Sequence, residues 1–231
     1  MPSPQLTVTF DAYDPAYLAQ FWAGLLGRKV VGDSLVPGDE TQLSLRFVAS
    51  SARKPGPNRL HLHLTSTSLD DQQRTVASAL GLGAAHLDVG QLPEEGHIVL
   101  ADPEGNEFCV IEPGNNFLAG CGLLGELACD GTRAVGHFWS AALGWPLVWD
   151  QDEETAIQAP PGGTKVAWGG PPLAPKQSRN RQRFELTVPG DDLGAQVERL
   201  VSLGATRLET GEGGAVELAD PDGNEFCVRA L

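Results

Sequence analysis

The chain has 231 residues, of which 41% are hydrophobic and 20% charged, a balance typical of folded globular proteins. Its formal net charge of −14 leaves no basic surface for a phosphate backbone or an anionic membrane, so we expect neither nucleic acid nor membrane as a partner. The sequence contains no run of about 18 apolar residues. Its start has neither the basic residues nor the apolar core of a signal peptide, so we expect a cytoplasmic protein.

The first half of the chain predicts alternating strands and helices. Asp14 and Pro15 suit the start of a helix, because aspartate caps the first turn and proline fits the first helical position, and Gly27 suits its end. The alternation of leucine and histidine around His61 and His63 is typical of a half-buried strand with both histidines on one face. The expected strands span 6–10, 43–48, 60–64, 98–100 and 107–111, and the expected helices span 15–26 and 70–80.

The second half predicts the same order of elements. The expected strands span 123–129, 155–159, 165–168 and 184–188, the expected helices span 132–143 and 193–203, and a hairpin ends the chain. A basic stretch at 176–183 precedes one of these strands. It has two interpretations, a loop that holds an anionic group of a substrate or a solvated loop that pairs with the acidic surface. We favour the second.

Two almost identical segments reveal an internal repeat. Residues 100–110 read LADPEGNEFCV and residues 218–228 read LADPDGNEFCV, so that only Glu104 and Asp222 differ. Two shorter motifs recur in the same order, Phe-Trp-x-x-x-Leu-Gly at 21–27 and 138–144, and Leu-Gly-Ala at 82–84 and 203–205. Three ordered matches indicate a duplication. We predict a first domain at 1–114, a linker at 115–122 and a second domain at 123–231.

Together these motifs resemble the glyoxalase/bleomycin-resistance family, also called the vicinal oxygen chelate superfamily. The strongest marker is the Asp-Pro-(Glu/Asp)-Gly-Asn turn followed by a strand, and the tandem form resembles glyoxalase-like proteins common in actinomycetes. The resemblance implies an α+β fold of tandem glyoxalase-like domains, each built of two βαβββ modules whose curled mixed sheets surround a cleft. It also implies that family enzymes hold a divalent metal there, with His, Gln or Glu ligands from the first and last strands.

The ligand positions implied by the resemblance hold mostly other residue types. In the family the last ligand is a Glu three residues after the Asn of the turn, where this chain has Cys109 and Cys227. His61 and Cys109 remain as weak metal candidates, whereas a catalytic metal needs about three protein ligands. A hard divalent metal also prefers carboxylate and imidazole to thiolate. We therefore expect no cofactor, with a divalent metal as the alternative.

The same strands supply the residues expected in the cleft. Because the four cysteines form no Cys-x-x-Cys pair, we expect free thiols. Each cleft cysteine is either a small buried filler or a nucleophile activated by a neighbour such as His61 or Arg183. Trp168 is either an aromatic wall for a flat ligand or a core residue. The expected cleft residues are His61, His63, Glu107, Cys109, Trp168, Arg183, Glu185 and Cys227.

These observations leave three functions open. We expect a glyoxalase-like protein that binds a small organic molecule in a cleft without a catalytic metal, as the drug-sequestering, bleomycin-resistance branch of the family does. The alternatives are a metal-dependent enzyme of the superfamily, such as a lyase, isomerase or dioxygenase, and a regulatory or scaffold protein with vestigial clefts. The two halves are expected to form a pseudo-dimer within a monomer, or the chain forms a homodimer.

Overall fold

The computed structural model describes residues 4–92, 94–210 and 214–231, and the first repeat contains two units of one βαβββ pattern. Module 1 comprises β1 (Gln5–Ala12), α1 (Pro15–Leu26), β2 (Val30–Val31), β3 (Ser34–Leu35) and β4 (Ser44–Ala49). Module 2 comprises β5 (Leu60–Leu64), α2 (Leu69–Gly81), β6 (Ala85–His86), β7 (Ile98–Ala101) and β8 (Glu107–Val110). The predicted domain boundary falls in the connection that follows β8.

The second repeat has the same pattern in modules 3 and 4. Module 3 comprises β9 (Leu124–Cys129), α3 (Arg133–Leu143), β10 (Leu147–Gln151), β11 (Glu154–Gln158) and β12 (Lys165–Trp168). Module 4 comprises β13 (Gln182–Val188), a short 3-10 helix (Gly190–Asp192), α4 (Leu193–Ser202), β14 (Thr206–Thr210), β15 (Val216–Ala219) and β16 (Glu225–Ala230). Within the described ranges, no helix is long and apolar enough to cross a membrane.

The helix predicted from Asp14 and Gly27 is confirmed at both ends. The Asp14 side chain accepts a hydrogen bond from the backbone N–H of Tyr17 at 3.0 Å, and Gly27 adopts the left-handed conformation with φ of 64°. The main strands and the other three helices also lie where the sequence predicts them. Five strands had no prediction of their own: β2, β3, β6, β10 and β14. Strands β2, β3 and β6 have two residues each, which are too few to show alternation.

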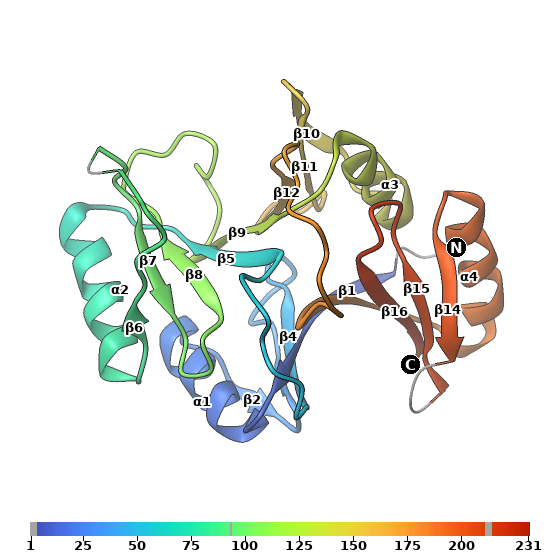
Figure 1. Ribbon diagram of the computed structural model, residues 1–231, viewed down its shortest axis with the longest axis horizontal. Coiled ribbons are helices and arrows are strands. Elements are labelled where there is room, and N and C mark those ends of the chain that lie inside the picture. Colours follow the sequence, from blue (N-terminus) through green and yellow to red (C-terminus); the bar gives the residue numbers. More distant parts are fainter. Residues whose placement is uncertain (1–3, 93, 211–213) are drawn as a thin grey trace.

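The strands form two eight-stranded mixed sheets, and each sheet combines one module from each repeat. Sheet A has the order β14-β15-β16-β13-β1-β4-β3-β2, and sheet B has the order β10-β11-β12-β9-β5-β8-β7-β6. Antiparallel pairing of β1 with β13 joins the halves of sheet A, and pairing of β5 with β9 joins those of sheet B. Figure 1 shows β5 and β9 between the helices of the first repeat at left and those of the second at right. The tandem α+β fold is therefore confirmed.

Each repeat is also held together internally, by its Phe-Trp motif. Trp22 of α1 packs edge-on against Phe108 of β8 with ring centroids 5.1 Å apart, although α1 and β8 belong to different modules and sheets. In the second repeat Trp139 packs in the same way against Phe226 at 4.9 Å. All four rings are at most 2% exposed. The duplicated motif therefore joins the two modules of one repeat through the hydrophobic core.

The repeated Asp-Pro-x-Gly-Asn turn fixes the position of that core. Asp102 accepts hydrogen bonds from the backbone and side-chain nitrogens of Asn106, and also from the indole N–H of Trp22 at 3.2 Å. Glu104 accepts hydrogen bonds from the backbone N–H groups of Tyr13 and Asp14, at the start of α1. The second repeat makes the equivalent contacts from Asp220 to Asn224 and Trp139, and from Asp222 to the start of α3. Glu104 and Asp222 occupy the one position at which the two repeated segments differ. Each carboxylate accepts a hydrogen bond from the start of the first helix of its own repeat.

The shared sheets predict that neither repeat folds as a stable monomer alone. A chain cut between β8 and β9 leaves β1 and β5 as open sheet edges in one fragment and β9 and β13 in the other. We expect the co-expressed fragments to form a 1:1 complex with a single cooperative thermal transition. Each fragment alone should aggregate or pair with itself in size-exclusion chromatography with light scattering. A monomeric fragment that unfolds cooperatively would contradict the shared-sheet arrangement.

Candidate functional site

Each sheet has one face toward the hydrophobic core and one face away from it. On β5 the three leucines are buried, whereas His61 and His63 lie on the opposite face and are partly exposed. We term the outward faces of the two sheets cleft A and cleft B. Cleft A contains Asp11, Arg46, Arg183, Glu185 and Cys227, and cleft B contains His61, His63, Cys109, Glu126 and Ala128. Both repeats contribute to each cleft.

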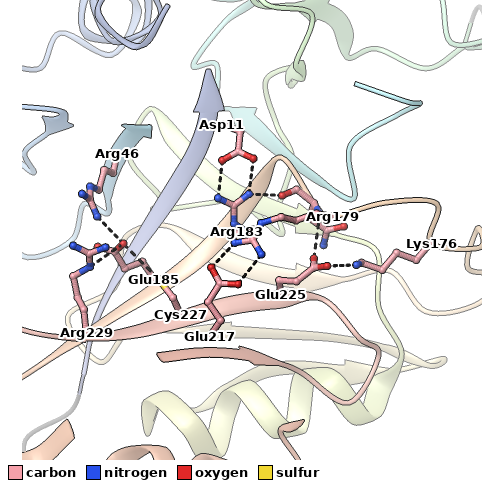
Figure 2. Close-up of polar contacts among 11 residues, drawn as sticks. Asp11, Arg46, Lys176, Arg179, Arg183, Glu185, Glu217, Glu225, Cys227 and Arg229 are labelled. Atoms are coloured by element: carbon pink, nitrogen blue, oxygen red, sulfur yellow. Dashed lines mark hydrogen bonds and ion pairs between the residues drawn. The ribbon is translucent and has the colours of Figure 1, made fainter. Parts of the chain in front are cut away.

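Ion pairs line cleft A, and two of them join the two repeats. Arg183 donates to both carboxylate oxygens of Asp11, at 2.9 and 2.6 Å. Arg46 at 2.9 Å and Arg229 at 3.2 Å converge on Glu185, which is only 5% exposed (Figure 2). Removal of one member of a buried pair costs about 3–5 kcal/mol, because the other charge stays buried alone. A ligand could enter this face only by displacing such pairs.

The basic stretch before β13 belongs to the same network. Lys176 pairs with Glu225, and Arg179 makes two 2.6 Å hydrogen bonds to Glu217 (Figure 2). Arg181 is 5% exposed and donates to Glu104 in the turn of the first repeat. The four cations of this stretch therefore pair with acidic residues of the chain, as the favoured interpretation expects.

Cys227 lies in cleft A next to Glu185. Its thiol donates to Glu185 Oε2 at 3.5 Å. Burial, together with the negative charge of Glu185, raises the pKa of Cys227 to about 12. This cysteine therefore stays a neutral thiol at physiological pH, which disfavours a nucleophilic role and fits the expectation of a small filler.

Cleft B, by contrast, contains open space on both sides of His61. A cavity of about 470 Å³ lies on the side of the second repeat, against Ala128, Ala156 and Ala167. A second cavity of about 670 Å³ lies on the side of the first repeat, against Val99, Glu107 and Cys109. His61 lines both cavities. Volumes of this size match those of pockets for small organic ligands.

His61 presents an unused ring nitrogen at this point. Its Nε2 is buried and has no hydrogen-bond partner. Burial lowers the pKa of His61 against the opposing effects of Glu107 and of a hydrogen bond to the Asn58 backbone. The imidazole is therefore neutral at physiological pH.

His63, Cys109 and Glu126 lie side by side on three neighbouring strands. The register pairs His63 with Cys109 on β8 and with Glu126 on β9, and His63 Nδ1 lies 2.8 Å from Glu126 Oε2. Burial alone would lower the pKa of His63, but hydrogen bonds to Cys109 and Glu126 and the charges of both raise it to about 9. His63 is therefore an imidazolium between a carboxylate and a sulfur atom.

The eight expected cleft residues fall into three places. His61, His63, Glu107 and Cys109 share cleft B, whereas Arg183, Glu185 and Cys227 share cleft A. Trp168 contributes to the wall of the 470 Å³ cavity but is only 2% exposed and packs within the hydrophobic core. Glu107 is 8% exposed and pairs with Lys54.

Several cleft B residues were not in the predicted set. Trp149 is 39% exposed and lines the smaller cavity with Phe117, whose ring lies 6.2 Å from it. Glu126 and Ala128 come from β9 of the second repeat. These side chains lie opposite His61 and His63 because β9 of the second repeat pairs with β5 of the first, a pairing that the repeat pattern alone does not indicate. The residue types around 124–129 predict a strand, but they do not indicate that this strand pairs with β5.

The residues of the clefts do not fit a catalytic metal. Among the described residues, no group of three or more His, Cys, Asp or Glu side chains is placed to hold a metal ion. In cleft B the neighbouring positions on β9 and β12 are Ala128 and Ala167, which offer no donor. In cleft A, Arg46 and Arg183 flank Thr9, and their positive charges oppose a cation. The imidazole of His63 is already bonded on both sides.

The raised pKa of His63 predicts a pH-dependent stability. A histidine whose pKa is higher in the folded state stabilises it fully below about pH 6.5, and this contribution is lost between pH 6.5 and 9. We expect the free energy of unfolding to fall across this range by up to about 3 kcal/mol. Urea denaturation at several pH values measures the fall. It should shrink in His63→Gln, and an equal fall in both proteins would contradict the assignment.

Known proteins share this architecture. A family model described as a glyoxalase-like domain matches residues 7–111 and 126–229, once in each repeat. Glyoxalase I from Zea mays is 14% identical with a TM-score of 0.62, over 98% of this chain and 92% of that chain. A putative dioxygenase from Bacillus subtilis is 12% identical with a TM-score of 0.62, over 99% of this chain and 86% of that chain.

At such identities, the likeness to the two solved structures shows the fold alone. No curated protein has a significantly similar sequence. The family model, however, covers most of the chain in two matches that coincide with the two repeats. The chain therefore belongs to the glyoxalase-like domain family and carries two copies of its domain.

Proposed function

We propose that this chain binds one small organic molecule in cleft B without a catalytic metal, and that cleft A is structural. The observation that supports this most directly is the contrast between the two clefts. Cleft B has two cavities and an unpartnered His61 nitrogen, whereas the charged groups of cleft A pair with one another. The internal pairing of the repeats also supports a chain that works as a monomer with a pseudo-dimer inside it.

The lining of the smaller cavity suggests which ligands fit. Its walls combine Trp149 and Phe117 with three alanines, which suits a flat apolar ring system. Glu126, Asp130 and Glu154 also line it, and the described lining residues include neither lysine nor arginine. Among these carboxylates, Glu126 pairs with the protonated His63 and Asp130 lies 3.9 Å from Arg59, whereas Glu154 has no ion pair among the described contacts. With His61 neutral, Glu154 therefore gives the lining a net negative charge. A planar aromatic cation is therefore the ligand class that matches both shape and charge.

This proposal predicts selective binding of a cationic dye. Acridine orange, a planar cation, should bind in fluorescence titrations with unchanged affinity in excess EDTA, because no metal takes part. The anionic dye ANS should bind at least about tenfold more weakly, through repulsion by the acidic lining. Ala128→Phe, which fills the cavity, should weaken acridine orange binding at least about tenfold, corresponding to about 1.4 kcal/mol.

Ala128→Ser is the matched control, because it keeps the cavity open at the same position. Its affinity for acridine orange should stay close to that of the wild type. Equal binding of both dyes, or no effect of Ala128→Phe, would contradict the proposed site. Loss of binding in EDTA with recovery on addition of one equivalent of a divalent metal would instead support a metal-dependent protein.

A further inference from the structure

We propose that Cys109, His63 and Glu126 form a nucleophilic thiol site that captures small soft electrophiles of the α,β-unsaturated carbonyl class. The inference rests on the proposed function, since the electrophile has to enter cleft B. It goes beyond that function by adding a covalent step on a residue of the chain. Three observations carry it: the order of the three side chains, the cavity next to the sulfur, and the contrast with Cys227.

The order of the side chains is that of a nucleophile, a base and a group that orients the base. Glu126 Oε2 lies 2.8 Å from His63 Nδ1, which leaves Nε2 as the ring nitrogen available to the sulfur of Cys109. Cys109 and His63 are direct neighbours in the parallel register of β5 and β8. Three rigid strands hold these residues. An imidazolium next to a cysteine favours the thiolate form of the nucleophile, and a carboxylate on the other side of the ring stabilises the imidazolium.

Cys109 also lies next to space for a substrate. It is partly exposed and lines the 670 Å³ cavity together with Val99, Leu87 and Val89. Lys54 lines the cavity as well, but its ammonium pairs with Glu107. The sulfur therefore faces an accessible and largely apolar wall, which suits a small neutral electrophile.

The duplication supplies an internal comparison. Cys227 occupies the position of Cys109 in the second repeat, and its neighbour across the parallel strand pair is Glu185 instead of His63. A carboxylate next to a thiol disfavours the thiolate, whereas a histidine promotes it. Two differences therefore separate the surroundings of the two cysteines: Glu185 replaces His63, and Thr7 replaces Glu126.

The chemical step is an addition that conserves all atoms. Cys109 Sγ forms a C–S bond to the β carbon, and the π electron pair of the C=C bond moves to the α carbon as an enolate. The proton that left the thiol returns to the α carbon from His63. Nothing is oxidised or reduced and no group leaves, so the step needs no further reactant.

The test measures the rate at which each cysteine adds N-ethylmaleimide or acrylamide, by mass spectrometry of the full-length protein and its peptides. At pH 7 we expect Cys109 to react at least about 10²-fold faster than Cys227. His63→Gln and Glu126→Gln should each slow Cys109 by about tenfold or more. Cys227→Ser, which leaves the site intact, should not change the rate.

The pH profile separates a chemical role of His63 from a structural one. In the wild type the rate at Cys109 should depend less steeply on pH between 6.5 and 8 than in His63→Gln, because His63 takes part in the proton transfer. In His63→Gln the rate should rise about tenfold per pH unit over this range, as for an ordinary thiol. Thermal melting of each variant confirms that it is folded. If His63→Gln does not fold, Glu126→Gln provides the same comparison.

Two outcomes would overturn the proposal: Cys109 reacting no faster than Cys227, or rates and pH profiles unaffected by both substitutions. Ala128→Phe distinguishes this inference from the proposed function. It should abolish binding of acridine orange in the smaller cavity while Cys109, on the other side of His61, still reacts rapidly. Fast addition at Cys109 without dye binding by the wild type would support the thiol site and refute the dye site.

Discussion

The antiparallel pairing of first strands across the two repeats determines the rest of this structure. Because β1 pairs with β13 and β5 pairs with β9, each sheet takes one module from each repeat. The Phe-Trp helices connect in the other direction, from module to module within one repeat. The two sheets thus join repeat to repeat, and the hydrophobic packing of the Phe-Trp helices joins the two modules within each repeat. The chain therefore has two clefts, neither of which belongs to a single repeat.

This shared construction explains how the clefts could diverge. In a symmetric dimer of identical chains, each substitution would alter both clefts. Here each cleft has its own residues, so His63 can face Glu126 in cleft B while Glu185 faces Thr7 in cleft A. Cleft A then gains ion pairs that tie the repeats together, and losing one partner of such a pair costs about 3–5 kcal/mol. Cleft B instead contains the two cavities on either side of His61. In the proposed function, cleft A stabilises the assembly and cleft B is available for a ligand.

The sequence predicted the features that depend on local signals. The turn at Asp102 and the capped helix from Asp14 to Gly27 involve residues close in the chain, and each half of the duplication repeats these local motifs. The structure confirms all three. It could not predict which strand pairs with β5, because a strand edge carries no local signal for its partner. For that reason Glu126 and Trp149 were absent from the expected cleft. The sequence left two interpretations open for Trp168, an aromatic wall or a core residue, because the direction of its side chain depends on the strand register. In the structure Trp168 is 2% exposed and lies mainly in the core.

The central claim is that the two clefts of one chain have different roles. Native mass spectrometry of the intact chain with increasing acridine orange tests it most directly, because it counts bound molecules. We expect saturation at one molecule per chain, because the charged groups of cleft A pair with one another. Saturation at two molecules per chain with equal affinity would show that both clefts bind and that their roles do not differ.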